Sequence, residues 1–282
     1  LPKAMQAPVM AHEIFHAIQD QEWGGGKLID SKRYGNDAVL AHAALLEGDA
    51  TIVMVNFAQG GQDSSTNGFV IKTIAASLPL QMSSPQFPVM ASAPDYMKQS
   101  LIFPYQQGLL FVAALRQKGY TWPKIREVYA KPPQSTEQIL HPQRYIDGDI
   151  PSEVKLPTTL LKGSRARWTG TTGEFHHRQL LLGRLSITEA VRGAEGWDGD
   201  ETLLLEGPDG QVAVTLSVWD SISEAKEFVE ALGRAYGQTH PSHATLVVER
   251  KDSQVAYAFS GEAKLAMKAV KAAFGQGKIS RK

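Results

Sequence analysis

The sequence predicts an α+β fold, with a mainly helical first domain over residues 1–163 and a small α+β second domain over residues 164–282. Three observations predict it. Apolar residues recur at helical spacing before residue 150, and no convincing alternating strand lies between Gln21 and Pro151. The stretch PSEVKLPTTLLKGS, residues 151–164, has the composition of a linker or an extended edge. After it, β-rich segments alternate with helical ones, so a sheet is expected there.

The first domain is expected to consist of helices and loops. Its expected helices run over residues 7–21, 36–57, 69–80, 95–103, 105–118 and 121–130, with a short helical turn from Ser135 or Thr136. Pro8 suits a first helical position, and Pro104 is expected to break the chain into two helices. Asn36 or Asp37 can cap the second helix. The stretches 24–35 and 60–68 are glycine-rich loops, and the stretch 83–94, rich in Pro and Ser, is irregular.

The second domain is expected to contain two β-hairpins and four helices. The strands pair as 201–205 with 212–219 and as 244–249 with 254–259, and the helices run over 174–182, 187–194, 221–236 and 262–274. The order from residue 201 predicts a small antiparallel sheet with helices on one face. The tail from Gly275 is expected to be frayed.

Composition excludes several classes of protein. Lysine plus arginine and aspartate plus glutamate each number 29, and no basic stripe appears, which argues against a nucleic-acid-binding protein. The 43% hydrophobic content supplies a sizeable core, yet no apolar run approaches the roughly 18 residues of a membrane span. Cysteine is absent, so disulfides contribute nothing. The chain begins at Leu1 and is expected to be a processed or truncated product.

The motif His-Glu-x-x-His lies in the first expected helix. His12 and His16 are four residues apart, so they point the same way and could hold one Zn²⁺. Glu13 lies about 100° round the helix from His12, within reach of a water at the metal, where it could act as general base. The apolar residues that gather on the other side would anchor the helix in a core: Val9, Ala11, Ile14, Phe15 and Ile18.

A third metal ligand is expected from the second helix, where Glu47 is the best candidate. Small residues surround Glu47 on the helical wheel, and Gly48 adds to them, so a neighbouring helix could approach closely. Asp49 and His42 lie roughly opposite Glu47 and are its rivals. Thr51 could support a ligand by a hydrogen bond, or could bond its own backbone. Two histidines and a glutamate leave a coordination position for water, as in catalytic zinc sites.

These motifs resemble those of known proteins. HEIFH followed by a helical EGDA resembles the gluzincin zinc metallopeptidases. VMAHEIFHAIQDQ, ALLEGDATIVM, FPYQQGLLFV and STEQILHPQRY look like a group of bacterial, largely uncharacterised metallopeptidase-like proteins, and GWDGDETLLLEG extends this likeness into the second domain. The resemblance implies a zinc metallopeptidase acting on peptides or proteins, and an extracytoplasmic or secreted location. Thr51 departs from the thermolysin-like pattern, which has Asp there.

Two further residues are candidates for stabilising the oxyanion of a tetrahedral intermediate. Tyr105 follows the expected helix break at Pro104, where it could donate from its hydroxyl or simply pack. His141 precedes Pro142, and gluzincins often place a histidine or tyrosine opposite the metal. Glu137 or Tyr145 could orient His141, although Glu137 is also suited to cap the local turn.

Alternative functions remain open at this point. A catalytically weak or inactive metallopeptidase-like module for binding or assembly is one, because the second domain shows no catalytic constellation. Zinc hydrolysis of a non-peptide amide is another. Gluzincin domains normally place a sheet before the motif helix, so the sheet that aligns the substrate is expected to come from an upstream segment or a partner chain. His176 and His177 are adjacent and diverge by about 100°, which argues against a shared metal.

Overall fold

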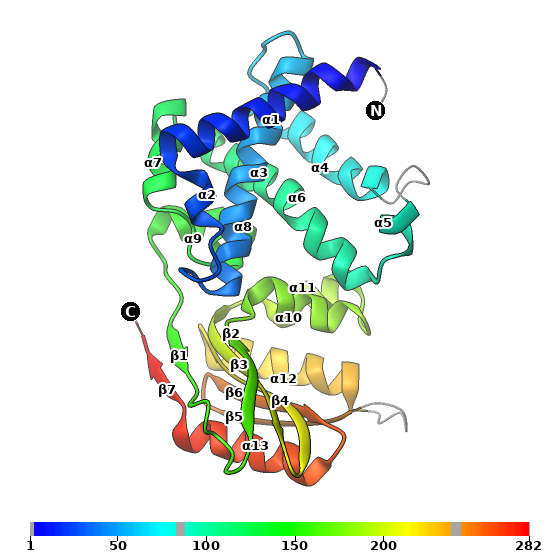
Figure 1. Ribbon diagram of the computed structural model, residues 1–282, viewed down its shortest axis with the longest axis vertical. Coiled ribbons are helices and arrows are strands. Elements are labelled where there is room, and N and C mark those ends of the chain that lie inside the picture. Colours follow the sequence, from blue (N-terminus) through cyan, green and yellow to red (C-terminus); the bar gives the residue numbers. More distant parts are fainter. Residues whose placement is uncertain (1–2, 83–87, 238–243, 282) are drawn as a thin grey trace. The chain divides into compact units, whose positions relative to one another are not determined.

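The protein has an α+β fold divided into two compact units, Leu1–Asp149 and Ile150–Lys282. The structure is a computed structural model that describes residues 3–82, 88–237 and 244–281 (Figure 1). The division falls earlier than the boundary expected after residue 163. The reason is that Val154, Leu156 and Leu160 are buried in the core of the second unit, so the expected linker belongs to that unit.

Every regular element described in the first unit is a helix, as expected. These helices are α1 (Lys3–Trp23), α2 (Gly25–Leu28), α3 (Asn36–Ala58), α4 (Gly68–Met82), α5 (Pro88–Ser92), α6 (Asp95–Gln117), α7 (Trp122–Ala130), α8 (Thr136–Leu140) and α9 (Pro142–Asp147). Residues 83–87 of the stretch expected to be irregular lie outside the described residues, and α5 occupies part of the remainder.

Helix α3 is the central helix of this unit, contacted by α1, α2, α6 and α8. By length and composition alone, α3 is apolar enough to cross a membrane, contrary to the expectation that no such run exists. Most of its apolar window is buried by the neighbouring helices, and it carries Glu47 and the buried Asp49. Asp37, expected as a possible cap, instead accepts hydrogen bonds from the backbone and hydroxyl of Thr136 at the start of α8.

Helices α3 and α6 cross at two glycines. A β-carbon placed on Gly48 would lie 2.1 Å from the backbone carbon of Gly108, and one on Gly108 would lie 1.9 Å from the backbone oxygen of Ala44. Only glycine fits at either position. Gly48, beside Glu47, therefore serves the contact with α6, rather than the close approach to the motif helix that the sequence suggested.

Two prolines lie inside helices that they were expected to open or to break. Pro8 is within α1, and Pro104 is within the continuous helix α6, so the predicted break before Tyr105 is wrong. Proline removes one backbone hydrogen bond and crowds the preceding turn. Packing offsets this cost in α6, where Phe103, Pro104 and the residues around Gly108 are buried.

Helix α1 buries a different side from the one expected. His12 is only 7% exposed, whereas Ile14 and Ile18 are 56% and 39% exposed. Met10 is 59% exposed and extends this stripe by one turn. The prediction that the apolar side anchors α1 is therefore wrong for Ile14 and Ile18. Side-chain hydrogen bonds of His12 and Gln19 to α3 hold the opposite side instead.

The second unit contains an antiparallel sheet of five strands in the order β2-β3-β4-β6-β5. These strands are β2 (Arg165–Gly170), β3 (Trp197–Gly207), β4 (Gly210–Trp219), β5 (Thr245–Lys251) and β6 (Gln254–Ser260). Both predicted hairpins are present, and Asp252 takes the left-handed conformation in the second turn. Strand β2 was not predicted, because as a mostly exposed edge strand with an irregular register it has no apolar alternation.

Helices cover both faces of this sheet, so the prediction of helices on one face is wrong. Helix α13 (Ala263–Gln276) packs on the face that carries Val214, Leu216 and Ala256. Helices α10 (Gly173–Leu182), α11 (Ile187–Ala194) and α12 (Ile222–Tyr236) share the other core, with Val255 and Tyr257. Successive residues of β6 alternate between the two cores, as a strand buried on both faces requires.

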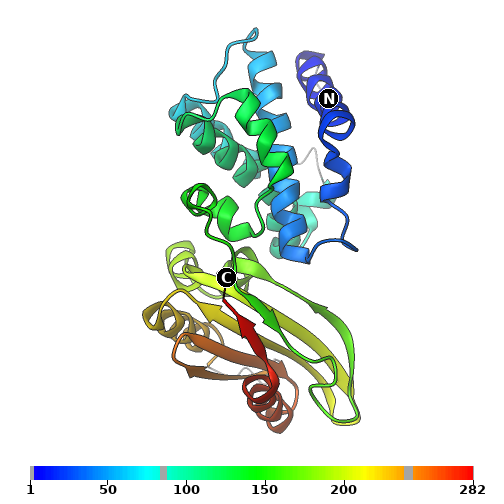
Figure 2. The same ribbon diagram turned by 90° about the vertical axis from the view of Figure 1, so that its left-hand side faces the viewer.

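The C-terminal tail is ordered by a second, small sheet. Strand β7 (Lys278–Ser280) pairs antiparallel with β1 (Glu153–Lys155), and Figure 2 shows the two strands side by side. The expectation of a frayed tail from Gly275 is therefore wrong. Ile279 packs against the same core as Val154, which explains why a three-residue strand holds there.

Candidate metal centre

Three side chains from α1 and α3 bring their ligand atoms together. His12 Nε2 lies 2.9 Å from His16 Nε2 and 3.1 Å from Glu47 Oε2, and His16 Nε2 lies 3.3 Å from the same oxygen. One turn of helix separates the two histidines, so both rings extend from α1 on the side that faces α3. All three residues predicted to bind the metal therefore meet at one place.

The donor set fits a zinc ion. Ligands at about 2.0–2.2 Å around a tetrahedral zinc are about 3.3–3.6 Å apart, and the separations of 2.9–3.3 Å are close to this. Imidazole nitrogens with one carboxylate oxygen are typical zinc ligands, and three protein ligands leave one position open.

Hydrogen bonding sets the charge of the Glu47 carboxylate. Burial alone would raise the pKa of Glu47, but hydrogen bonds from His12 and His16 outweigh it and lower the pKa to about 2. The hydrogen bond to Glu47 is also the main reason that the pKa of His16 is raised, against the opposing effect of burial. Glu47 is thus held ionised at neutral pH, the form that a carboxylate ligand needs.

A chain of hydrogen bonds begins at His16 Nδ1, the ring nitrogen on the side away from Glu47. His16 Nδ1 lies 2.6 Å from Gln19 Oε1, and this bond orients the ring if Nδ1 carries the proton, leaving the lone pair of Nε2 free. Gln19 Nε2 donates to the Tyr129 hydroxyl at 2.8 Å, and Tyr129 donates to Asp49 Oδ2 at 2.7 Å. Sequence reasoning missed Gln19 and Tyr129, although the i+3 position of Gln19 on the motif helix was a usable signal.

The rivals of Glu47 lie elsewhere. Asp49 is the buried end of the chain just described, and burial raises its pKa to about 6 despite the hydrogen bond from Tyr129. His42 is buried with Nδ1 2.7 Å from the backbone oxygen of Leu28, and burial lowers its pKa. The Thr51 hydroxyl is buried without a hydrogen-bond partner among the described residues, so it fulfils neither of the roles considered for it.

Glu13 and Tyr105 both lie near the three ligands. Glu13 is exposed, and its negative charge contributes to raising the pKa of both His16 and Tyr105. The Tyr105 ring is stacked on the His12 ring with centroids 6.2 Å apart. Burial, and then the charge of Glu47, raise the pKa of Tyr105 to about 12, so its hydroxyl remains a donor. Tyr105 is one turn before Gly108, so the glycine crossing with α3 places it there, rather than a helix break.

The structure does not bring His141 to this cluster. His141 joins α8 to α9, and α8 contacts the first turn of α3 through Thr136 and Asp37. That turn is ten residues, about 15 Å along the helix, from Glu47. Glu137 is paired with Arg144, and the Tyr145 hydroxyl donates to the backbone of Lys131.

A largely apolar cavity of about 320 Å³ opens beside the cluster. His16 and Glu47 form one part of its wall, and Ile29, Ala43 and Leu46 contribute the apolar part. Its size is within the range of small ligand-binding sites.

Comparison with known proteins gives a single domain match. A family model described as "Domain of unknown function (DUF8575)" matches residues 160–273, which lie within the second unit. No curated protein and no solved structure is significantly similar to the chain. The matched residues contain none of the residues of the metal cluster, so any function assigned to the first unit is argued from its own geometry.

Proposed function

We propose that the first unit is a gluzincin-type zinc metallopeptidase that hydrolyses peptide bonds. The observation that carries the proposal is the meeting of His12 Nε2, His16 Nε2 and Glu47 Oε2 within 3.3 Å of one another. When bound by these three ligands, zinc would supply Lewis-acid polarisation of the scissile carbonyl and of the attacking water.

The residues around the ligands then have distinct tasks. The Glu13 carboxylate accepts a proton from the attacking water and passes it to the leaving amine. Tyr105 donates a hydrogen bond to the developing oxyanion, a role supported by a pKa of about 12, which keeps the hydroxyl protonated at neutral pH. Tyr105 is the better candidate for this role than His141, because it stacks on His12.

The cavity beside the cluster supports a peptide substrate with an apolar side chain. Ile29 and Leu46 would contact that side chain while the scissile bond lies over His16 and Glu47. The cavity would hold one side chain of the peptide but offers no strand to pair with its backbone, since the described elements of the first unit are helices. We further propose that a segment or partner chain outside this sequence supplies the strand that aligns the peptide, and that it covers the exposed stripe of Met10, Ile14 and Ile18.

The test compares wild-type protein with the variant Glu13→Gln. Both proteins should bind one zinc per chain, because Glu13 is not a ligand, and only the wild type should cleave a broad peptide library. Glu22→Gln changes an exposed carboxylate at the far end of the same helix and serves as the matched control. Equal turnover in wild type and Glu13→Gln would overturn the proposed mechanism. If zinc binds but neither protein cleaves any peptide, the binding or assembly module becomes the better interpretation.

A further inference from the structure

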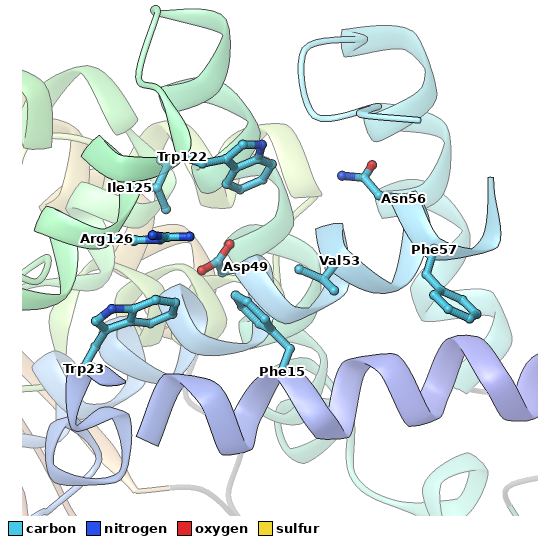
Figure 3. A pocket seen from close by; sticks show the side chains of 9 residues that line it. All are labelled: Phe15, Trp23, Asp49, Val53, Asn56, Phe57, Trp122, Ile125 and Arg126. Atoms are coloured by element: carbon cyan, nitrogen blue, oxygen red, sulfur yellow. The ribbon is translucent and has the colours of Figure 1, made fainter. Parts of the chain in front are cut away.

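A second pocket in the first unit is separate from the metal cluster. It is a cavity of about 330 Å³ bounded by α1, α3 and α7, and its aromatic walls include Phe15, Trp23 and Trp122 (Figure 3). It is open to solvent, because these three rings are only half-buried. Neither His12, His16 nor Glu47 lines it.

The pocket contains a polar atom that no described residue satisfies. Asp49 lines the cavity and is only 2% exposed. Its Oδ2 accepts the hydrogen bond from Tyr129, whereas Oδ1 is buried without a hydrogen-bond partner among the described residues. In Figure 3 the carboxylate lies at the centre of the lining side chains, with Trp122 on one side and Phe15 on the other. A buried acceptor of this kind favours a ligand that brings an N–H donor.

A positive group lines the same cavity. The Arg126 guanidinium is 5.6 Å from the centroid of the Trp23 ring, and its charge acts on the Asp49 carboxylate. The two groups form no ion pair with each other among the described interactions, so each retains capacity for a ligand. An acceptor and a donor of opposite charge therefore line the same cavity, and a ligand carrying an N–H next to an oxygen would satisfy both.

The aromatic walls are held in place before any ligand arrives. Trp122 Nε1 donates to Asp63 Oδ2 at 3.1 Å, and the Arg116 guanidinium is 4.4 Å from the centroid of the Trp122 ring. Trp23 contacts Phe15 and Tyr129, with ring centroids 6.0 Å and 5.0 Å away. Rings fixed in this way lose little freedom when a ligand binds between them.

We propose that this pocket binds an aromatic amino-acid unit, with its N–H group on Asp49, its carbonyl or carboxylate oxygen facing Arg126, and its ring among the aromatic walls. In such a unit the nitrogen and the oxygen-bearing carbon are attached to the same carbon, and the ring is attached through one further carbon. This matches a pocket in which Asp49 and Arg126, together called its polar end below, lie among aromatic side chains. The unit could be a free amino acid or a residue within a peptide, and the two sources share the same recognition chemistry.

The experiment follows the five tryptophan indole N–H resonances by two-dimensional NMR on the full metal-free chain. Trp23 and Trp122 line the pocket, whereas Trp168, Trp197 and Trp219 lie in the second unit and act as internal controls. One arm titrates L-phenylalanine, and the other titrates N-acetyl-L-phenylalaninamide, which mimics a residue within a chain. Saturable shifts confined to the indoles of the pocket in either arm support the proposal, and the arm that saturates identifies the source.

Two variants test the polar end of the pocket. Asp49→Asn should turn its carbonyl to Tyr129 and present an amide N–H to the ligand, which should weaken binding about tenfold or more. Arg126→Met keeps an apolar stem on an exposed residue and should weaken binding similarly, even if Asp49→Asn fails to fold. Arg184→Met is the matched control, because Arg184 stacks on Tyr236 in the second unit at a similar distance of 5.3 Å.

Three results would overturn the proposal. One is the absence of any saturable shift at Trp23 and Trp122 with both probes at millimolar concentration. Another is an unchanged affinity in Arg126→Met. The third is equal binding of toluene, which has the ring without the polar end. Because the titrations use metal-free protein, failure here leaves the proposed peptidase function untouched, and loss of zinc binding in other variants leaves this pocket untouched.

Discussion

Each unit contains a pair of histidines on a helix, and the two pairs have different surroundings. In α1, His12 and His16 are four residues apart, and their Nε2 atoms lie 2.9 Å from each other beside a carboxylate. In α10, His176 and His177 are adjacent, and the Nδ1 atom of each lies within 2.8 Å of a backbone oxygen of its own helix. Spacing along a helix therefore decides whether two rings can share a ligand.

The surroundings of the two pairs also differ in polarity. His177 is buried among aromatic rings, with Nε2 3.1 Å from the Tyr257 hydroxyl and Phe228 at a centroid distance of 5.2 Å. His16 instead has the carboxylates of Glu47 and Glu13 near it, and it is only half-buried. His177 of the second unit has the surroundings of a satisfied core residue, whereas the pair of the first unit lies with Glu47 in a group of side chains that could hold a metal ion.

The largest effect is expected from Glu47→Gln. If each of three ligands carries a comparable share of a typical zinc-binding free energy, losing one should weaken zinc binding by about 3–5 kcal/mol. The matched change is the double variant His176→Gln and His177→Gln, which should leave zinc stoichiometry at one per chain. Calorimetric zinc titration of the purified apo proteins measures both the zinc affinity and the zinc stoichiometry of each variant. Equal weakening by the two changes would contradict the distinction between the pairs.

The next largest effect is on the free energy of unfolding, and it comes from the glycine crossing of α3 and α6 that places Tyr105 near Glu47. Gly48→Ala would force a β-carbon to 2.1 Å from the Gly108 backbone, so we expect a loss of about 3 kcal/mol or more in the free energy of unfolding. Gly233→Ala is the control, because no atom lies within 4 Å of the added carbon in α12. That change should stabilise the protein by up to about 1 kcal/mol. Denaturant unfolding monitored by circular dichroism gives both values.

A smaller effect on zinc affinity is expected from replacing Gln19, which hydrogen-bonds His16. Gln19→Met removes the hydrogen bond to His16 Nδ1 at 2.6 Å, and loss of such a partner typically weakens metal binding about 10–100-fold. Gln21→Met, an exposed position on the same helix, is the control. Thermal unfolding of the apo proteins should be recorded as well, since Gln19 also bonds Leu46 and Tyr129. An unchanged zinc affinity in a folded Gln19→Met protein would show that His16 is oriented without this partner.

The histidine of the second unit should matter for stability alone. His177→Leu removes a ring that contacts the Gly173 backbone and the Tyr257 hydroxyl, so we expect a loss of about 1–2 kcal/mol in the free energy of unfolding. Zinc binding should be unchanged, and the two measurements together separate a structural role from a metal role.

The sequence predicted which three side chains meet better than it predicted their surroundings, for a physical reason. The way that His12 and His16 point to one side follows from helix geometry, which is local, and the positions of Glu47 and Asp49 on roughly opposite sides of α3 follow from it too. The position of Tyr105 depends on the Gly48–Gly108 crossing, a contact between segments far apart in the chain. The hydrogen bonds from Gln19 through Tyr129 to Asp49 also need tertiary contact, so only the i+3 spacing of Gln19 was readable beforehand.

In the fold, too, local features were predictable from the sequence, whereas features set by tertiary contacts were not. Both hairpins of the second unit consist of β-rich segments joined by short turns, and their prediction is confirmed. The missed strand β2 is an exposed edge, and β7 is a short strand ordered only by pairing with β1. The prolines inside α1 and α6 show that tertiary packing can override a local breaker. The apolar side of α1 was expected to be buried, yet Ile14 and Ile18 are exposed. Side-chain hydrogen bonds of His12 and Gln19, rather than apolar burial, hold the contact of α1 with α3.

The smallest expected effect contrasts two carboxylates, one in each unit. Asp63 of the first unit accepts hydrogen bonds from Ser65, Arg116 and Trp122. Although burial opposes it, the hydrogen bonds from Ser65 and Arg116 and the charge of Arg116 lower the pKa of Asp63 from 3.8 to about 2. A lowered pKa in the folded state gives stability that is present above pH 3.8 and is lost as the pH falls towards about 2. Because the side chain is partly exposed, the contribution should not exceed about 1 kcal/mol.

The variant Asp63→Asn tests this contribution. It should be less stable than wild type at pH 7, and the difference should shrink as the pH is lowered through the range between about 4 and about 2. Glu206→Gln in the second unit is the comparison, because Glu206 also pairs with an arginine, Arg167, and its side chain is about as exposed as that of Asp63, but among the described interactions it accepts no hydrogen bond from a tryptophan. Urea unfolding at several pH values, followed at the indole N–H of Trp122 for the first unit, reads the local effect of Asp63. A stability difference for Asp63→Asn that stayed constant with pH would mean that the carboxylate acts only by shape, through the tryptophan that it holds.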